Sequence, residues 1–198
     1  FEACGPVYRG GPEVGQAGPI YWATGAGGRS VPLLKVLVTS RCHGGCRYCA
    51  FHAGRDVRRW TLSPGELASS FEGMWRAGRI RGAFLSSGLS PTPSAAMDRL
   101  IESAALIRRR GFRGYLHLKV LPGIDDGQLA AAAALASRLS VNLEAPSRDR
   151  LRALAPGKSR PQLLRTQLRA LATLTDRGDL PTSGWTTQFV VGPAGESD

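Results

Sequence analysis

Three cysteines in one loop are the residues most clearly placed to do chemistry. Cys42, Cys46 and Cys49 have the spacing C-x₃-C-x₂-C and follow a short β-branched run at residues 36–39. Thiolates this close in sequence can converge on one soft metal centre, and iron–sulfur cubanes are held by cysteine thiolates, normally four. Three cysteines leave one iron of such a cluster without a protein ligand. The loop therefore predicts a cluster with one iron open to a reactive molecule.

A closed zinc site is the alternative for the same loop. Cys42, Cys46 and Cys49, with His43 or His52 as the fourth ligand, would make a Cys₃His centre. The chain has four cysteines, and three of them stand in this metal-type loop. This distribution of the cysteines favours free thiols in a reducing compartment over disulfides, so we expect a cytoplasmic location.

Length and charge bound the possible partners. At 198 residues the chain is one domain by size, and no apolar run approaches the ~18 residues that span a membrane. It begins with Phe1 and ends at Asp198, and we expect it to be a piece of a longer protein. The net charge of +11 suggests a polyanionic partner such as DNA or RNA. GC-rich codon bias would explain arginine in place of lysine, but not the excess over acidic residues.

The pattern along the chain alternates strands with helices. Residues 1–34 are rich in Gly and Pro and are expected to form an irregular extension. We expect strands at 35–40, 82–86, 114–121, 139–145 and 184–191, and helices at 64–77, 94–110, 125–137 and 160–177. Five such repeats are typical of a parallel sheet with βαβ crossovers.

One face of the later strands carries polar side chains: His117, Lys119, Asn142, Glu144 and Gln188. A fully packed parallel barrel would fill this face with branched apolar side chains, and burying polar groups without partners is costly. We therefore expect a polar cavity that holds a ligand near the C-terminal ends of the strands. An antiparallel sheet with its polar face in water is the alternative, which the intervening helices disfavour. An internal ion pair with Glu144 is the alternative to a binding role for Lys119.

The cysteine loop resembles that of the radical S-adenosylmethionine (radical SAM) family. In that family C-x₃-C-x₂-C follows the first barrel strand, with an aromatic residue before the last cysteine, where Tyr48 stands here. The resemblance implies that Cys42, Cys46 and Cys49 hold a [4Fe–4S] cluster whose remaining iron binds S-adenosylmethionine (SAM). Reductive cleavage would then give a 5′-deoxyadenosyl radical that abstracts a substrate hydrogen. It also implies a flavodoxin- or ferredoxin-type reductant as a partner.

The resemblance extends to the other strand ends. Residues 190–197 are similar to the family's fifth-strand motif, which helps to hold the adenine. Ser86, Ser87 and Gly88 stand where the family has a Gly-Gly-Glu-like segment that contacts the SAM amino group, which is a departure. The implied cofactor-binding residues are Tyr48, Ser86, Ser87, Gly88, Asn142, Glu144, Gln188, Val191, Gly192, Gly195 and Glu196. No catalytic residue is assigned, because the cofactor supplies the chemistry.

Five basic residues are candidates for substrate contact: His117, Lys119, Arg55, Arg58 and Arg59. The three arginines stand beside Trp60, and basic groups next to an aromatic ring can hold phosphates and stack on a base. A solvated loop is the alternative for this segment.

The implied fold is α/β, a partial (β/α)₆ TIM-like radical SAM barrel at 35–198. About five βα units are present and the C-terminal part is missing. Segments 34–39, 84–88, 115–119, 141–146 and 154–159 resemble bacterial radical SAM proteins assigned to DNA modification or repair. We therefore expect a radical SAM enzyme that acts on DNA or another nucleic acid. The alternatives are a non-catalytic zinc-binding nucleic-acid module and a radical SAM enzyme for a small molecule or peptide.

Overall fold

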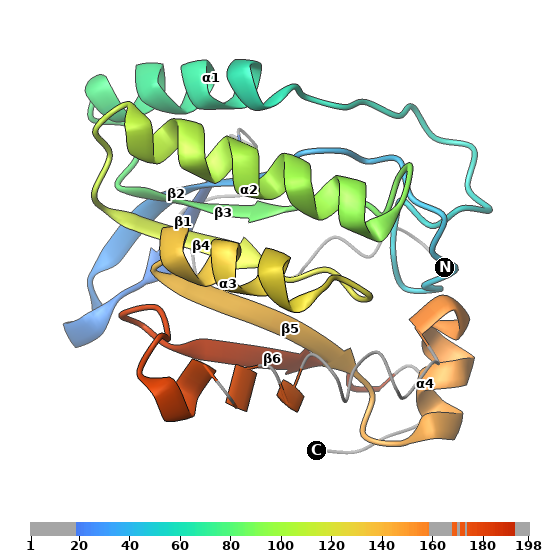
Figure 1. Cartoon of the computed structure of the whole chain (residues 1–198). Coiled ribbons are helices and arrows are strands. Elements are labelled where there is room, and N and C mark those ends of the chain that lie inside the picture. The colour runs from blue at the N-terminus through green and yellow to red at the C-terminus, as the bar shows by residue number, and fades with distance from the viewer. Residues whose placement is uncertain (1–18, 159–167, 170, 173, 193–198) are drawn as a thin grey trace.

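The computed structural model describes residues 19–158, 168–169, 171–172 and 174–192, which are built around one mixed sheet (Figure 1). The six strands lie in the order β1-β2-β3-β4-β5-β6. Strand β1 is antiparallel to β2, and each later strand is parallel to the one before it. The strands are β1 (Ile20–Thr24), β2 (Ser30–Leu37), β3 (Gly82–Ser86), β4 (Tyr115–Lys119), β5 (Arg138–Glu144) and β6 (Trp185–Phe189). Five parallel strands in sequence order form a half-barrel and confirm the predicted fold class.

Three helices cover one face of the sheet. They are α1 (Pro64–Arg76), α2 (Pro93–Arg109) and α3 (Asp126–Leu135), and Figure 1 shows them as one layer. Helix α4 (Arg148–Leu154), followed by the 3₁₀ turn η2 (Pro156–Lys158), lies instead beyond the C-terminal end of β5. Each of α1, α2 and α3 connects two neighbouring parallel strands, so the antiparallel alternative is wrong for β2 to β6.

The N-terminal segment differs from the prediction. Within the described part of the predicted irregular extension, residues 19–34, β1 and the first half of β2 form a hairpin closed by the 3₁₀ turn η1 (Ala26–Gly28). Proline normally argues against a central strand, yet Pro32 lies in β2 opposite Trp22. Because of that proline and the glycine-rich turn, the sequence pattern missed β1 and the first part of β2, whereas the end of β2 falls within the predicted strand at 35–40. Residues 1–18 lie outside the described residues, so the division of the chain at residue 34 stays a prediction.

The hydrophobic core lies between the helical layer and the sheet. Leu116, Leu118 and Val120 of the β4 region are at most 3% exposed, which confirms that they share the buried face. Phe71 of α1 and Leu100 of α2 belong to the same buried cluster. The opposite face of the sheet is thereby left to the polar residues.

The helices begin where the sequence predicts. Ser63 caps α1: its hydroxyl accepts from the Glu66 N–H, and the Glu66 carboxylate accepts from the Ser63 N–H at 2.7 Å. Pro64 occupies the first helical position, where a missing N–H costs nothing. Of the predicted helix at 160–177, the described residues 168–169, 171–172 and 174–177 are helical, and the others lie outside the described part.

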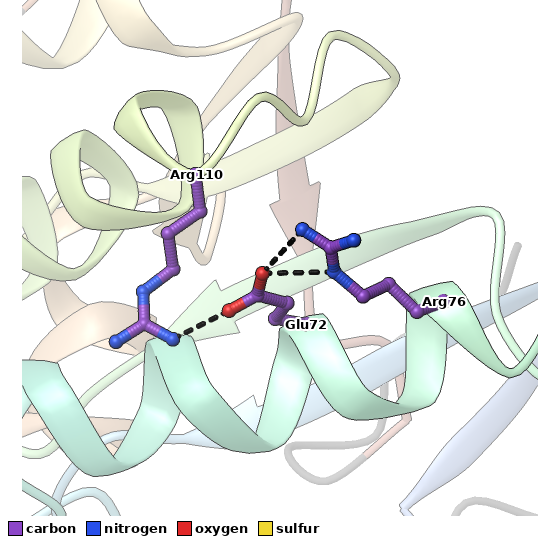
Figure 2. A network of polar contacts seen from close by, with 3 residues as sticks. All are labelled: Glu72, Arg76 and Arg110. Carbon is purple, nitrogen blue, oxygen red and sulfur yellow. Dashed lines mark hydrogen bonds and ion pairs between the residues drawn. The ribbon is translucent and has the colours of Figure 1, made fainter.

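One carboxylate joins two helices on the outer surface (Figure 2). Glu72 of α1 accepts from Arg76, one turn further along, at 2.8 Å, and from Arg110 at the end of α2 at 2.6 Å. These hydrogen bonds lower the pKa of Glu72. The pairs orient α2 against α1 and are far from the polar face of the sheet.

No helix among the described residues is both long enough and apolar enough to cross a membrane.

Candidate functional site

A pocket of about 150 Å³ opens at the C-terminal ends of β2 to β5. It lies where the sequence predicts a ligand cavity, because parallel strands bring their C-terminal ends to the same edge. The predicted site residues that line it are Cys42, Cys46, Cys49, Tyr48, Ser86, Ser87, Gly88, Lys119 and Asn142. Residues far apart in sequence are therefore brought to one cavity.

The three cysteines are free thiols that face this cavity. The Gly44 N–H donates to Cys42 Sγ at 3.2 Å, and the Phe51 N–H donates to Cys49 Sγ at 3.3 Å. A Cβ on Gly44 would lie 3.2 Å from Cys42 Sγ and 3.8 Å from Cys46 Sγ, so glycine leaves these sulfurs room. These two backbone donors orient the Cys42 and Cys49 sulfurs at the cavity wall.

The two histidines that could complete a zinc site form other hydrogen bonds. His43 Nε2 lies 2.7 Å from the Pro91 carbonyl oxygen, and His52 Nδ1 accepts from the Gly54 N–H. Among the described residues, no three His, Cys, Asp or Glu side chains gather around one metal-ion position. This finding covers the three cysteines as well, which line one cavity without converging on a single ion.

Two hydroxyl residues before the first cysteine fix the start of the loop. Thr39 and Ser40 are buried, and Thr39 Oγ1 donates to the Trp60 carbonyl oxygen at 3.1 Å. Ser40 Oγ accepts from the Trp60 N–H at 2.9 Å. Sequence reasoning missed this role, although two hydroxyls directly before a cysteine loop were the available signal.

Arg59 does not occupy the position expected of a substrate ligand. Its guanidinium is directed at the backbone and donates to four carbonyl oxygens of the cysteine loop and its flanks. Arg55 and Arg58, the other two predicted phosphate ligands, are exposed. The Arg59 guanidinium is thus already engaged with the backbone, and phosphate contact stays a prediction for all three arginines.

A buried polar chain lies behind the cysteines. The Tyr48 hydroxyl hydrogen-bonds with the Glu144 carboxylate and with Cys46, and burial, with the Glu144 charge next, raises the pKa of Tyr48. Burial also raises the pKa of the Cys46 thiol. Glu144 is 1% exposed and forms an ion pair with Lys158 Nζ. The ion pair of Glu144 is thus with Lys158, which sequence reasoning did not single out, and not with Lys119, the pair that the alternative for Lys119 required.

The backbone of Glu144 explains its position. A strand irregularity separates Asn142 from Glu144, and Glu144 has a φ of 66°, which is uncommon for a residue with a side chain. Such a conformation persists only where the surroundings hold it. Here the carboxylate is held by Tyr48 and Lys158, and Glu144 itself does not line the cavity.

Two hydrogen-bonding atoms of the cavity lack partners. Asn142 Oδ1 and Ser87 Oγ are buried and have no hydrogen bond to any described residue, although both residues line the cavity. Buried polar atoms normally have partners, so such atoms indicate a ligand that supplies them. Lys119 also lines the cavity and forms no ion pair with the described residues; burial, with Lys158 next, lowers its pKa.

His117 and the β6 residues lie apart from the cavity. His117 Nε2 is buried without a partner in the described part of the chain, and the ring centre lies 4.4 Å from that of Phe84. Burial lowers the pKa of His117 to about 4. Gln188, Val191 and Gly192 are exposed, and Gly195 and Glu196 lie outside the described residues. Substrate contact by His117 and SAM binding by the residues from Gln188 onward stay predictions.

The comparisons with known proteins decide the family. The profile described as the radical SAM superfamily matches residues 36–198. The chain belongs to the radical SAM superfamily. Members use a [4Fe–4S] cluster and SAM, so these are its cofactors and the zinc-module alternative is set aside. No curated protein matches the chain significantly.

Solved structures of radical SAM enzymes share the fold. Methylornithine synthase (PylB) has a TM-score of 0.58 at 15% identity, over 78% of this chain and 42% of its own. The FeFe-hydrogenase maturase HydG from Carboxydothermus hydrogenoformans has 0.56 at 16%, over 69% and 33%. The cobalamin-dependent S-adenosylmethionine radical enzyme OxsB has 0.55 at 14%, over 79% and 23%. The chain spans less than half the length of each of these proteins.

The residues at the cavity fit the radical SAM cofactors. Three free thiols, two of which accept a hydrogen bond from a backbone N–H, suit iron–sulfur ligation. The unpartnered Asn142 Oδ1 and Ser87 Oγ suit the hydroxyl and amino donors of SAM. The cavity therefore has the soft ligands and the hydrogen-bonding atoms that the two groups require.

Proposed function

We propose that this radical SAM protein is an enzyme that modifies or repairs DNA or another nucleic acid. Cys42, Cys46 and Cys49 would hold the cluster at the cavity they line. When bound, the cluster and SAM supply the radical chemistry, while the protein supplies binding, orientation and shielding. The cavity supports the binding of the cofactors, and the segment 55–60 beside it supports a nucleic-acid substrate.

The residues around the cavity have separable tasks in this proposal. Ser87 and Asn142 offer unpartnered acceptor atoms to SAM. Tyr48 is held by Glu144 at one wall, with its hydroxyl protonated because burial raises its pKa. Leu37 and Leu89, which also line the cavity, exclude water from a reactive intermediate.

An exposed basic and aromatic rim is the observation that supports a nucleic-acid substrate. Arg55 and Arg58 are exposed, and neither forms an ion pair with any residue the structure describes. Trp60 is 42% exposed, and its ring packs edge-on against Phe51 at 5.2 Å. Phe51 lines the cavity, so the rim borders it. Free guanidinium groups beside a stacking surface are suited to phosphates and an unpaired base.

Salt-dependent binding tests this substrate class. The anaerobically reconstituted protein is titrated with a fluorescent single-stranded DNA at several salt concentrations, against heparin as a non-nucleic polyanion. Each phosphate contact contributes about 0.7 to the slope of log affinity against log salt, so R55S/R58S should lower the slope by about 1.4. The matched control is R79S/R81S, which removes two exposed arginines at the opposite ends of the strands. Equal slopes for the two double variants, or equal affinity for DNA and heparin, would contradict the proposal.

The partners follow from the family. A radical SAM reaction needs an electron, so we infer a flavodoxin- or ferredoxin-type reductant. A cytoplasmic location, proposed from the free cysteines, suits such a partner.

A small anionic substrate is the second candidate. Lys119 lines the cavity and has no ion-pair partner among the described residues, so its ammonium can receive a carboxylate or phosphate. Methylornithine synthase, a structural neighbour, is named for a small product. Lys119→Met would weaken binding of a small anion at the cavity and leave the salt slope for DNA unchanged.

A further inference from the structure

Arg59 is surrounded by backbone carbonyl groups of the cysteine loop. Its Nη1 donates to the Ser40 oxygen at 2.8 Å and to the Phe51 oxygen at 2.7 Å. Its Nη2 donates to the His52 and Arg55 oxygens, both at 2.9 Å. One of these carbonyls precedes Cys42 and three follow Cys49, so a single guanidinium joins both ends of the loop.

The loop is held by individual hydrogen bonds, which include those of Thr39 and Ser40 to Trp60. Residues 40–59 contain no helix or strand among the described elements. Its backbone hydrogen bonds include one across the loop, from the Ala53 N–H to the Gly44 oxygen, and one to α4, from the Arg47 N–H to the Leu154 oxygen. Hydrogen bonds from a charged donor are stronger than neutral ones. Arg59 therefore adds four charge-assisted hydrogen bonds to the neutral ones that join the two ends of the loop.

A short path connects Arg59 to a cysteine sulfur. Arg59 holds the Phe51 carbonyl, and the N–H of the same residue donates to Cys49 Sγ at 3.3 Å. The guanidinium also lies 5.9 Å from the centre of the Phe51 ring. Holding Phe51 therefore holds both a wall of the cavity and a hydrogen bond to a sulfur.

We propose that Arg59 is a positioning residue that sets the placement of Cys42 and Cys49 for the cluster. This inference rests on the proposed cluster site at the three cysteines. A lysine cannot replace Arg59, because one ammonium has three donors around a single atom, whereas the planar guanidinium spreads its donors over a fork. Arg59 touches neither substrate nor reacting atoms; it acts through the backbone of the loop.

The test measures the cluster itself. Wild type, R59K and R59Q are reconstituted anaerobically, with R58K and R58Q as matched controls at the exposed neighbouring arginine. We expect both Arg59 variants to lose iron to a chelator at least tenfold faster than wild type. Their reduced clusters should also show a broadened or shifted electron paramagnetic resonance (EPR) signal. The Arg58 variants should match wild type in both readouts. Wild-type rates of iron loss and an unchanged EPR signal in R59K and R59Q would overturn the inference.

Chemical rescue separates positioning from general instability. In R59A, millimolar guanidinium should enter the vacated site and slow iron loss, while it should not alter R58A. An R59A protein that folds, loses iron quickly and shows no rescue contradicts a positioning role for the guanidinium. If wild type itself holds no [4Fe–4S] cluster, the proposed function fails. If wild type holds one and the Arg59 variants match it, only this inference fails.

Discussion

Gly88 lies against the backbone of Arg41 so closely that no other residue fits. A Cβ on Gly88 would stand 2.1 Å from the Arg41 carbonyl oxygen, and the Gly88 N–H donates to the Thr39 oxygen at 2.7 Å. The end of β3 and the start of the cysteine loop are thereby in direct backbone contact. Glycine at this position has a steric reason that is independent of any contact with SAM.

Gly88→Ala should displace the cysteine loop. Because the clash is with backbone, the loop must move as a whole, and we expect a several-fold loss of bound iron after reconstitution. The matched control is Gly73→Ala in α1, where a Cβ meets nothing within 4 Å and should stabilise the helix by about 0.5–1 kcal/mol. Iron content and thermal midpoint are measured for both. Full iron content in Gly88→Ala would refute the steric argument.

Removing Lys158 should be more harmful than removing its whole ion pair. Lys158→Met leaves the Glu144 carboxylate buried without its cation, which typically costs about 3–5 kcal/mol. Adding Glu144→Gln to that variant removes the uncompensated charge, so the double variant should regain much of the stability. Thermal unfolding of the single and double variants checks this. A double variant no more stable than Lys158→Met would show that the charge is not the cause.

His117 should make the protein sensitive to mild acid. Its folded pKa of about 4 lies below the ordinary value of 6.5, since burial and the Arg138 and Lys119 charges disfavour the protonated ring. The unfolded chain therefore binds the proton first, and stability is full above pH 6.5 and falls as the pH drops towards 4. At pH 5 the loss should be about 2 kcal/mol. His117→Gln should flatten the pH dependence of the thermal midpoint, whereas His43→Gln should retain it. The same pH dependence in both variants would contradict this prediction.

Much of the fold was predictable because its signals are local. Alternating polar and apolar residues in β4 and β5 and the capping box at Ser63 each need only neighbouring residues to be read. Strand β1 was missed because its hairpin partner contains a proline and its turn is glycine-rich. Pattern reading treats both as loop signals.

The site was predictable only in part, because some of its contacts are set by tertiary structure. The cysteine spacing located the cavity, but nothing in the sequence told Arg59 from Arg58. The partner of Glu144 depends on the strand irregularity after Asn142 and on how η2 returns to the cavity. Without the backbone conformation, Lys119 and Lys158 are equivalent candidates for the ion-pair partner of Glu144.

The central claim is that Cys42, Cys46 and Cys49 hold a [4Fe–4S] cluster with one iron open to SAM. The direct measurement is iron and sulfide content, with the EPR spectrum of the reduced protein before and after SAM is added. The account predicts about four irons and four sulfides per chain, a signal that changes with SAM, and loss of both when any one of the three cysteines is replaced by alanine. A single bound zinc, or a cluster that survives these substitutions or ignores SAM, would contradict it.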